Sequence, residues 1–232
     1  MEYGKKDFGR LGQSVFIAFL AIGIVAFVIN IMVYAGMNGI LWFMRVPAVS
    51  APMMRKYLLY IFAGILAVFL YNFLASLLRA IGNSLVPLLF LGISAVLNII
   101  LDLLFVLRLN MGVEGAAVAT VISQYISAIG LLLYYFRKCP QLQVHHEQYK
   151  WSGQILREIT GLSVLTCVQQ SIMNFGILMV QGLVNSFGIA VMAAFTAAVK
   201  IDAFAYAPVQ DFGNAFSTFV AQNYGAGNRE RI

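Results

Sequence analysis

Six apolar runs of about twenty residues or more divide this 232-residue chain, and they constrain its fold more than any other feature. The hydrocarbon core of a bilayer is about 30 Å thick, and about 20 apolar residues in an α-helix cross it. Only 10% of the residues are charged and 61% are hydrophobic, whereas a soluble domain carries roughly 25% charged residues. The sequence therefore predicts an all-α integral membrane protein with six transmembrane helices.

The boundaries of the six spans follow from the polar segments between them. In chain order, the predicted spans cover residues 14–36, 55–78, 87–107, 113–136, 161–187 and 189–222. The segment 37–52 is expected to be irregular. The last span is expected to kink or tilt, because it is long and contains Pro208.

Basic residues are distributed unequally between the two sides of the membrane. Lys and Arg on the side that carries both chain ends outnumber those on the other side by ten to four. Cytoplasmic loops carry such an excess, so we expect a multi-pass protein of the cell (plasma) membrane with both ends cytoplasmic. The net charge of +6 lies in loops rather than in a basic stripe with interleaved aromatic residues. The lipid bilayer is therefore the expected partner, and no nucleic acid is.

An ionisable side chain inside a span is costly, which makes Asp102 the leading candidate for function. Asn98 lies one helical turn before it and shares its face. Counting about 1.5 Å per residue from the outer ends of the spans places Asp102 at a depth of roughly 9 Å and Thr120 at roughly 12 Å. Gln124 follows Thr120 by one turn. These oxygen-bearing groups suit a small hard cation or a proton, or they form a polar clamp between helices.

The sixth predicted span carries three further ionisable residues, Lys200, Asp202 and Asp211. Lys200 lies about 16 Å into the span and must face protein or water. Lys200 and Asp202 are two residues apart, so they point away from each other. They are candidates either for substrate contact or for structural ion pairs with another helix. Asp211 lies nearer the cytoplasmic end and can reach solvent there.

Several kinds of chemistry lack a sequence pattern here. There is no Walker motif for ATP hydrolysis, and no Ser–His–Asp or zinc-protease pattern appears in the spans. The chain is therefore not expected to be an enzyme or to bind a cofactor other than a coupling ion. Cys139 is expected in a polar loop and Cys167 inside a span, so we expect no disulfide between them.

Four segments of the chain resemble the multidrug and toxic compound extrusion (MATE) family of exporters. They are RAIGNSLVP (79–87), LNIILD (97–102), GVEGAAVAT (112–120) and AQNYGAGN (221–228). The resemblance implies twelve spans in two lobes of six helices. It also implies export of small amphipathic or cationic drugs or toxins, driven by a gradient of Na⁺ or H⁺.

On this template the six spans correspond to the third to eighth helices of a partial two-lobe bundle. Residues 1–151 would belong to the first lobe, without its opening two helices. Residues 152–232 would form the first two helices of the second lobe. The missing helices of the same protein are then expected partners.

The resemblance also implies a site in the first lobe. In the DinF-like branch of the family, a carboxylate, an Asn one turn earlier and a Thr on the next helix bind the coupling cation. The matching positions here are Asp102, Asn98 and Thr120. Tyr57 and Asn72 match polar positions of the surrounding network. The acidic residue that some branches place on the seventh helix has no counterpart in 161–187, which shifts the expected site to the first lobe.

Two alternatives to a secondary antiporter follow from the same residues. A flippase of lipid-linked oligosaccharides from the same superfamily should have a more cationic cavity, whereas only Lys200 lies clearly inside a span. A non-transporting membrane subunit, or a truncated relic of an exporter, is the alternative from a different class of protein.

Overall fold

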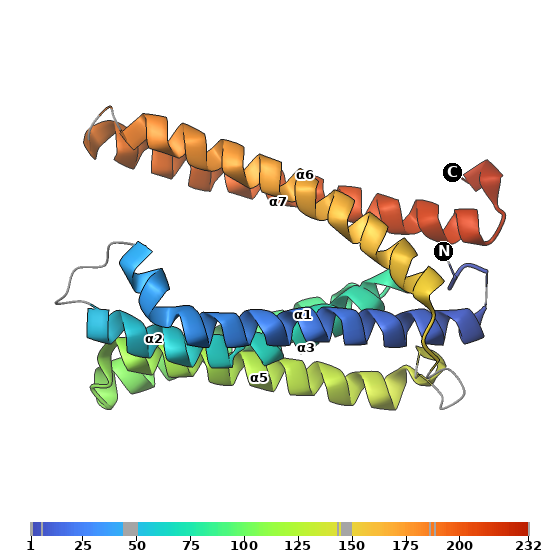
Figure 1. The fold of residues 1–232 in the computed structure, drawn as a ribbon, viewed down its shortest axis with the longest axis horizontal. Helices are drawn as coiled ribbons and strands as arrows, with labels where there is room; N and C mark the ends of the chain where they lie inside the picture. Colours follow the sequence, from blue (N-terminus) through green and yellow to red (C-terminus); the bar gives the residue numbers. More distant parts are fainter. Residues whose placement is uncertain are drawn as a thin grey trace. The chain divides into compact units, whose positions relative to one another are not determined.

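The computed structural model describes residues 2–5, 7–43, 51–142, 144, 150–185, 187 and 189–231. Within these residues all regular structure is helical (Figure 1). The long helices are α1 (Phe8–Phe43), α2 (Ala51–Ala63), α3 (Ile65–Ala80), α4 (Leu85–Asp102), α5 (Gly112–Lys138), α6 (Gly153–Asn185) and α7 (Ile189–Gly225). Six spans in this part of the chain are long and apolar enough to cross a membrane, which confirms the predicted architecture.

Four spans differ in detail from their prediction, one of them being the fifth, whose helix α6 begins at Gly153 and not at residue 161. Helix α1 continues to Phe43, so residues 37–43 are helical rather than irregular, while 44–50 lie outside the described residues. The helix continues because no proline occurs before Pro47. The second span is interrupted at Gly64, between α2 and α3. The third span ends in a π-helix, η1 (Leu103–Arg108), directly after α4.

The chain divides into two compact units, which we describe separately. One contains Phe8–Lys150, and the other contains Met1–Asp7 with Trp151–Ile232. Assignment of residues 1–151 and 152–232 to two lobes of a transporter stays a prediction, because the units are defined by packing within this chain alone.

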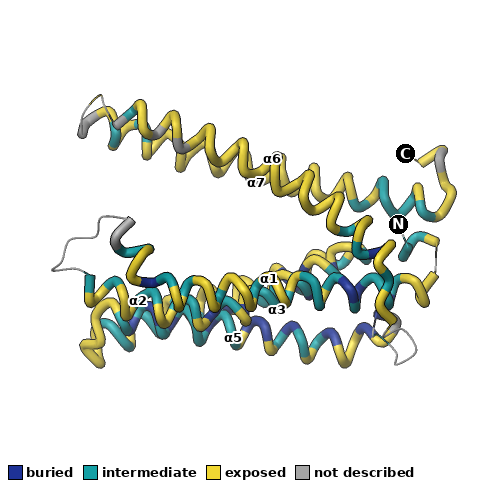
Figure 2. The backbone as a smooth tube through the Cα atoms, in the orientation of Figure 1, coloured by how far each residue is buried: buried dark blue, intermediate teal, exposed yellow. Residues whose placement is uncertain are grey.

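Helix α5 is the centre of the first unit and packs against α2, α3 and α4. Figure 2 shows dark, buried segments along α5. The buried residues of this helix are mostly small: Gly115, Ala117, Ala119, Ser123, Ser127, Ala128, Leu131 and Tyr135. Small side chains let helix backbones approach closely, which is how helices associate in lipid. Two serines fasten the contact with α4. Ser94 donates to the Ser123 carbonyl at 2.9 Å, and Ser127 donates to the Phe90 carbonyl at 3.0 Å.

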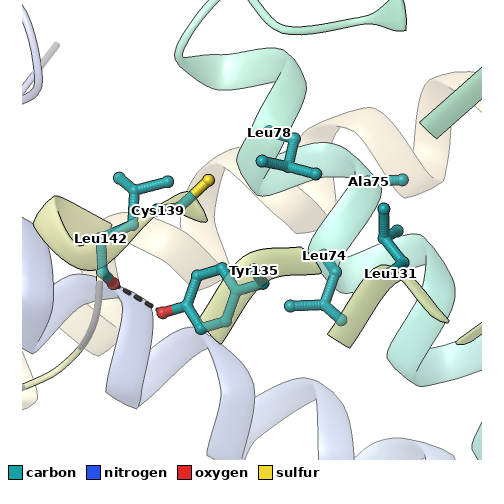
Figure 3. Close-up of a cluster of buried hydrophobic side chains, with 7 residues drawn as sticks. All are labelled: Leu74, Ala75, Leu78, Leu131, Tyr135, Cys139 and Leu142. Atoms are coloured by element: carbon teal, nitrogen blue, oxygen red, sulfur yellow. Dashed lines mark hydrogen bonds between the residues drawn. The ribbon is translucent and has the colours of Figure 1, made fainter. Parts of the chain in front are cut away.

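A cluster of buried apolar side chains closes one end of this unit (Figure 3). Its members are Leu74, Ala75, Leu78, Leu131, Tyr135, Cys139 and Leu142. The Tyr135 hydroxyl donates to the Leu142 carbonyl at 2.6 Å. Cys139 is 4% exposed, so it is part of the core and not of a polar loop. After α5 the chain continues into a short 3₁₀ helix, η2 (Pro140–Leu142), and Leu142 is buried in the same cluster as Cys139.

The second unit is built on α6 and α7, which pack against each other. The most apolar stretch of each helix is entirely without buried residues, and Figure 2 shows both helices exposed along most of their length. Helix α7 continues through Pro208 without ending. In a membrane protein, such apolar surface contacts lipid or other helices.

Candidate functional site

Asp102 is the last residue of α4 and is partly buried. Its Oδ1 atom is buried and has no hydrogen-bond partner, and it is the only such side-chain atom within the described residues. Buried polar atoms are nearly always hydrogen-bonded, because an unpaired one costs free energy. The described residues therefore leave this buried carboxylate oxygen without the partner that such an atom requires.

Asn98 and Thr120 form a bridge between α4 and α5, one turn from Asp102. The Asn98 Nδ2 atom donates to Thr120 Oγ1 at 3.3 Å, and the Thr120 hydroxyl donates to the Ala116 carbonyl at 2.9 Å. Thr120 thus keeps one lone pair free, and the Asn98 carbonyl oxygen remains available as an acceptor. Asn98 and Asp102 lie four residues apart on α4, so Asp102 shares a helix face with this bridge.

The π-helix η1 begins immediately after Asp102. Its wider turns are completed by hydrogen bonds from Leu109 N to Leu104 O and from Met111 N to Phe105 O, both at 3.0 Å. The start of α5 packs tightly against this segment. A Cβ atom on Gly115 would lie 2.9 Å from the Met111 Cβ and 3.0 Å from the Phe105 Cβ, so a larger residue would force this segment to shift. Single π-helical turns occur often at functional sites, and this one sets where α4 ends.

The other predicted site residues of the first unit are Gln124, Tyr57 and Asn72, and their surroundings differ. Gln124 is partly buried and points its Oε1 atom at Gly64, at the break in the second span. Tyr57 is partly buried and makes no side-chain hydrogen bond within the described part of the chain. Asn72 is exposed, and its Nδ2 donates to the Val68 carbonyl of its own helix at 2.9 Å. The structure therefore joins Asn98 to Thr120, with Asp102 one turn further along α4, and it links Asn72 only to its own helix.

Lys200, Asp202 and Asp211 lie on α7 in the second unit and are all exposed. None of the three makes an ion pair among the residues that the structure describes. Their predicted roles, in substrate contact or in pairing with another helix, concern surfaces that α6 and α7 leave open.

Sequence reasoning missed the polar contacts that hold the second span in place. Lys56 and Glu114 form an exposed ion pair at 2.8 Å that joins α2 to the start of α5. Asn30, Tyr34 and Tyr125 donate to backbone carbonyls of α2 near its end. The only available signal was a polar group inside each apolar run, and sequence alone does not say which helix such a group faces.

Comparison with known proteins agrees with this architecture. The family model described as MatE matches residues 1–104 and 164–232 of the chain. The chain belongs to the MatE family. This MatE chain is similar to the "Probable multidrug resistance protein YpnP" of Bacillus subtilis, with 33% identity over 190 residues. It is also similar to the "Probable multidrug resistance protein NorM" of Thermotoga maritima, with 27% identity over 184 residues.

Solved structures show the same fold. A crystal structure of MATE in complex with MaD3S superposes on 99% of the MatE chain with a TM-score of 0.91 and 21% identity. A transporter of the MOP superfamily from Pyrococcus furiosus, reported with a binding pocket of reverse polarity, superposes with a TM-score of 0.88 and 21% identity. The match covers 52% and 51% of those two chains.

The MatE chain spans about half the length of these relatives or less. The alignment with YpnP includes 82% of this chain but only 42% of YpnP. The alignment with NorM includes 77% of this chain but only 39% of NorM. These relatives are named as multidrug resistance proteins and not as enzymes, and the flippase alternative is not favoured. The chain is a multi-pass membrane protein of a multidrug efflux family that covers part of a full-length relative.

Proposed function

We propose that this chain contains the coupling site of a secondary antiporter, which exports small amphipathic or cationic compounds in exchange for Na⁺ or H⁺. The observation that carries the proposal is the buried Oδ1 atom of Asp102 without a hydrogen-bond partner within the described residues. A carboxylate in a membrane span carries a free-energy penalty of several kcal/mol. A bound cation or proton removes that penalty, so Asp102 binds one of them in at least one state of the transport cycle.

The two coupling ions make different demands on the site. A proton needs only the Asp102 carboxylate. Na⁺ is a hard cation that prefers several oxygen ligands. The free lone pair of Thr120 and the carbonyl oxygen of Asn98 offer two, because the bridge between them at 3.3 Å uses neither. Either ion drives transport only if it binds the inward-open and outward-open states with different affinity, since a ligand shifts an equilibrium by its differential affinity alone.

The relatives support the substrate class, since YpnP and NorM are named as multidrug resistance proteins. The full-length protein would supply the remaining helices of both lobes, and both ends of the present chain would lie in the cytoplasm of the cell. Lys200 and Asp202 are exposed on α7 and are candidates for contact with substrate or with those helices.

The test uses the full-length protein in proteoliposomes loaded with a cationic fluorescent dye. A Na⁺ gradient and a pH gradient are imposed separately, and the initial rate of export is measured. Asp102→Asn removes the charge and keeps the size, so gradient-driven export should fall at least tenfold. Glu158→Gln is the control, because that carboxylate is exposed near the start of α6 and is not a candidate for coupling or substrate contact, and its export rate should stay near that of the wild type.

The role of Asp102 is wrong if Asp102→Asn exports dye at the normal rate under both gradients. The antiporter proposal as a whole fails if the wild type exports under neither gradient while the reconstituted protein is folded.

A further inference from the structure

The second membrane span, Ala51–Ala80, is not one continuous helix. Helix α2 ends at Ala63 and α3 begins at Ile65, with Gly64 as a single turn residue between them. Gly64 N donates to the Ile61 carbonyl at 2.9 Å, a tighter turn than that of an α-helix, and Val68 N donates to the Gly64 carbonyl at 3.0 Å. The last carbonyls of a helix have no partner within it, and inside a membrane no water is present to replace one.

Side chains of two neighbouring spans hydrogen-bond to these carbonyls. Asn30 Nδ2 of α1 donates to the Phe62 carbonyl at 2.8 Å, and the Tyr125 hydroxyl of α5 donates to the Ala63 carbonyl at 2.9 Å. The Tyr34 hydroxyl, also on α1, donates to the Leu59 carbonyl at 2.9 Å. Three polar side chains thus converge on five consecutive residues of one span. All three carbonyls have donors within the protein, so the break does not need a ligand to satisfy them.

Gly64 is buried, and its lack of a side chain brings this break close to α5. A Cβ atom there would lie 2.5 Å from Gln124 Oε1 and 3.3 Å from Val121 Cγ2. It would also lie 3.1 Å from the Ile61 carbonyl oxygen. Val121 directly follows Thr120 in α5. The break therefore contacts the part of α5 that holds Thr120, within one helical turn of the Asn98–Thr120 bridge.

The hydrogen bonds at the break can be exchanged with their number unchanged, because two pairs of donors can serve the same two carbonyls. In a continuous helix the Phe62 and Ala63 carbonyls would accept from the N–H groups of Leu66 and Ala67, four residues on. Asn30 and Tyr125 would then be released. The carbonyls keep one donor each in both arrangements, so the interrupted and the continuous forms differ by a small free energy. Switching elements in proteins have this property, and hinges commonly lie at the ends of helices.

We propose that Gly64 is the hinge of the second span, on which α2 tilts relative to α3, and that the Asn30 and Tyr125 hydrogen bonds are the latch that holds the interrupted form. A change in tilt would move Gly64 against Val121 and Gln124 and so reach the α5 segment beside Thr120. The link to ion coupling rests on the function proposed above. The hinge itself is a property of the span and has a test that needs no transport.

The test measures the tilt directly in the full-length protein in lipid nanodiscs. Spin labels are attached at Met53→Cys on α2 and Ser76→Cys on α3, both exposed positions, in a background without other cysteines. A continuous helix would separate the two Cα atoms by about 35 Å, and a tilted pair gives a shorter distance. Pulsed electron paramagnetic resonance reports the populations of both forms.

Removing one latch donor, by Tyr125→Phe or Asn30→Leu, should raise the ratio of the continuous to the interrupted form roughly threefold, the effect of an average interhelical hydrogen bond in a membrane. The double variant should raise it roughly eightfold. The matched control is Tyr71→Phe, which removes a tyrosine hydroxyl bonded to the Pro87 carbonyl at 2.7 Å, away from the break. Its distance distribution should equal that of the wild type.

A distance distribution that is unchanged in Tyr125→Phe, Asn30→Leu and the double variant would overturn the hinge and leave a rigid kink. An equal shift in Tyr71→Phe would overturn it as well, because the effect would then be general. The spin-label distances test the hinge, and dye export by Asp102→Asn tests the proposed function. If Asp102→Asn exports dye normally, the proposed function is wrong, but a hinge detected by the distances is still supported.

Discussion

Replacing Thr120 by valine separates a ligand role of this hydroxyl from a structural one. Thr120→Val removes the hydrogen bond accepted from Asn98 at 3.3 Å and the one donated to the Ala116 carbonyl at 2.9 Å. The second loss has little effect, because that carbonyl also accepts an N–H within α5. The first is an interhelical hydrogen bond, which averages about 0.6 kcal/mol in membranes. The loss of stability should therefore be about 0.6 kcal/mol.

The expected effect on the coupling cation is larger. Loss of a group that holds a metal site together typically lowers affinity roughly tenfold or more, and tenfold is about 1.4 kcal/mol. Dye export by the full-length protein in proteoliposomes is measured against Na⁺ concentration, and stability is followed by thermal unfolding in detergent. Thr120→Ser keeps the hydroxyl and is the matched control, with an apparent Na⁺ affinity near that of the wild type.

Either of two results would refute the ligand role of Thr120. One is an unchanged apparent Na⁺ affinity in Thr120→Val together with a stability loss of several kcal/mol, which would identify a polar clamp. The other is wild-type export that runs at full rate without Na⁺, since a proton requires only the carboxylate of Asp102.

Two further predictions concern the buried cluster at the end of α3 and α5. Tyr135→Phe leaves the buried Leu142 carbonyl without its donor at 2.6 Å and should destabilise the protein by about 1–3 kcal/mol. Thermal unfolding of the full-length protein checks this. The control is Tyr134→Phe, which should change stability little because the Tyr134 hydroxyl accepts a long hydrogen bond from Asn83, at 3.5 Å; equal losses of stability in the two variants would contradict the prediction. Burial raises the pKa of the Cys139 thiol, so less thiolate is present at neutral pH than in an exposed cysteine. Cys167 is exposed and is replaced by serine in both proteins compared. Maleimide should then label Cys139 at least tenfold more slowly than it labels Lys138→Cys in a Cys139→Ser background, and the labelling rate of Cys139 should rise with pH. Equal rates at pH 7 would contradict the burial.

The number and order of the spans could be predicted because each apolar run is long enough to cross the bilayer as a helix and too apolar to be exposed to water. The interruptions within the spans could not be predicted in the same way. Gly64 is one of many glycines in apolar runs, and Gly92, in another span, has nothing within 4 Å of a Cβ atom. What distinguishes Gly64 is the convergence of side chains from α1 and α5, which requires knowledge of how the helices pack.

The candidate site was predictable to the extent that it is local. Asn98 and Asp102 share a face by spacing alone, and similar depth on adjacent antiparallel spans placed Thr120 near them. The π-helix η1 after Asp102 has no sequence signal, because its apolar residues suit an α-helix equally well. The same limit applies to Cys139, whose sequence neighbours are mostly polar although the residue is buried in the apolar cluster.

The exposed charges of α7 have a consequence for how the protein enters the membrane during synthesis. Among the six spans in the described residues, α1 has the highest mean hydropathy and α7 the lowest. Lys or Asp near the centre of a helix opposes insertion by the translocon by about 2.5–3.5 kcal/mol each, and α7 contains Lys200 and Asp202 with Asp211 further along. Helix α1 can therefore pass into lipid on its own, whereas α7 needs neighbouring helices beside it at the moment of release from the translocon.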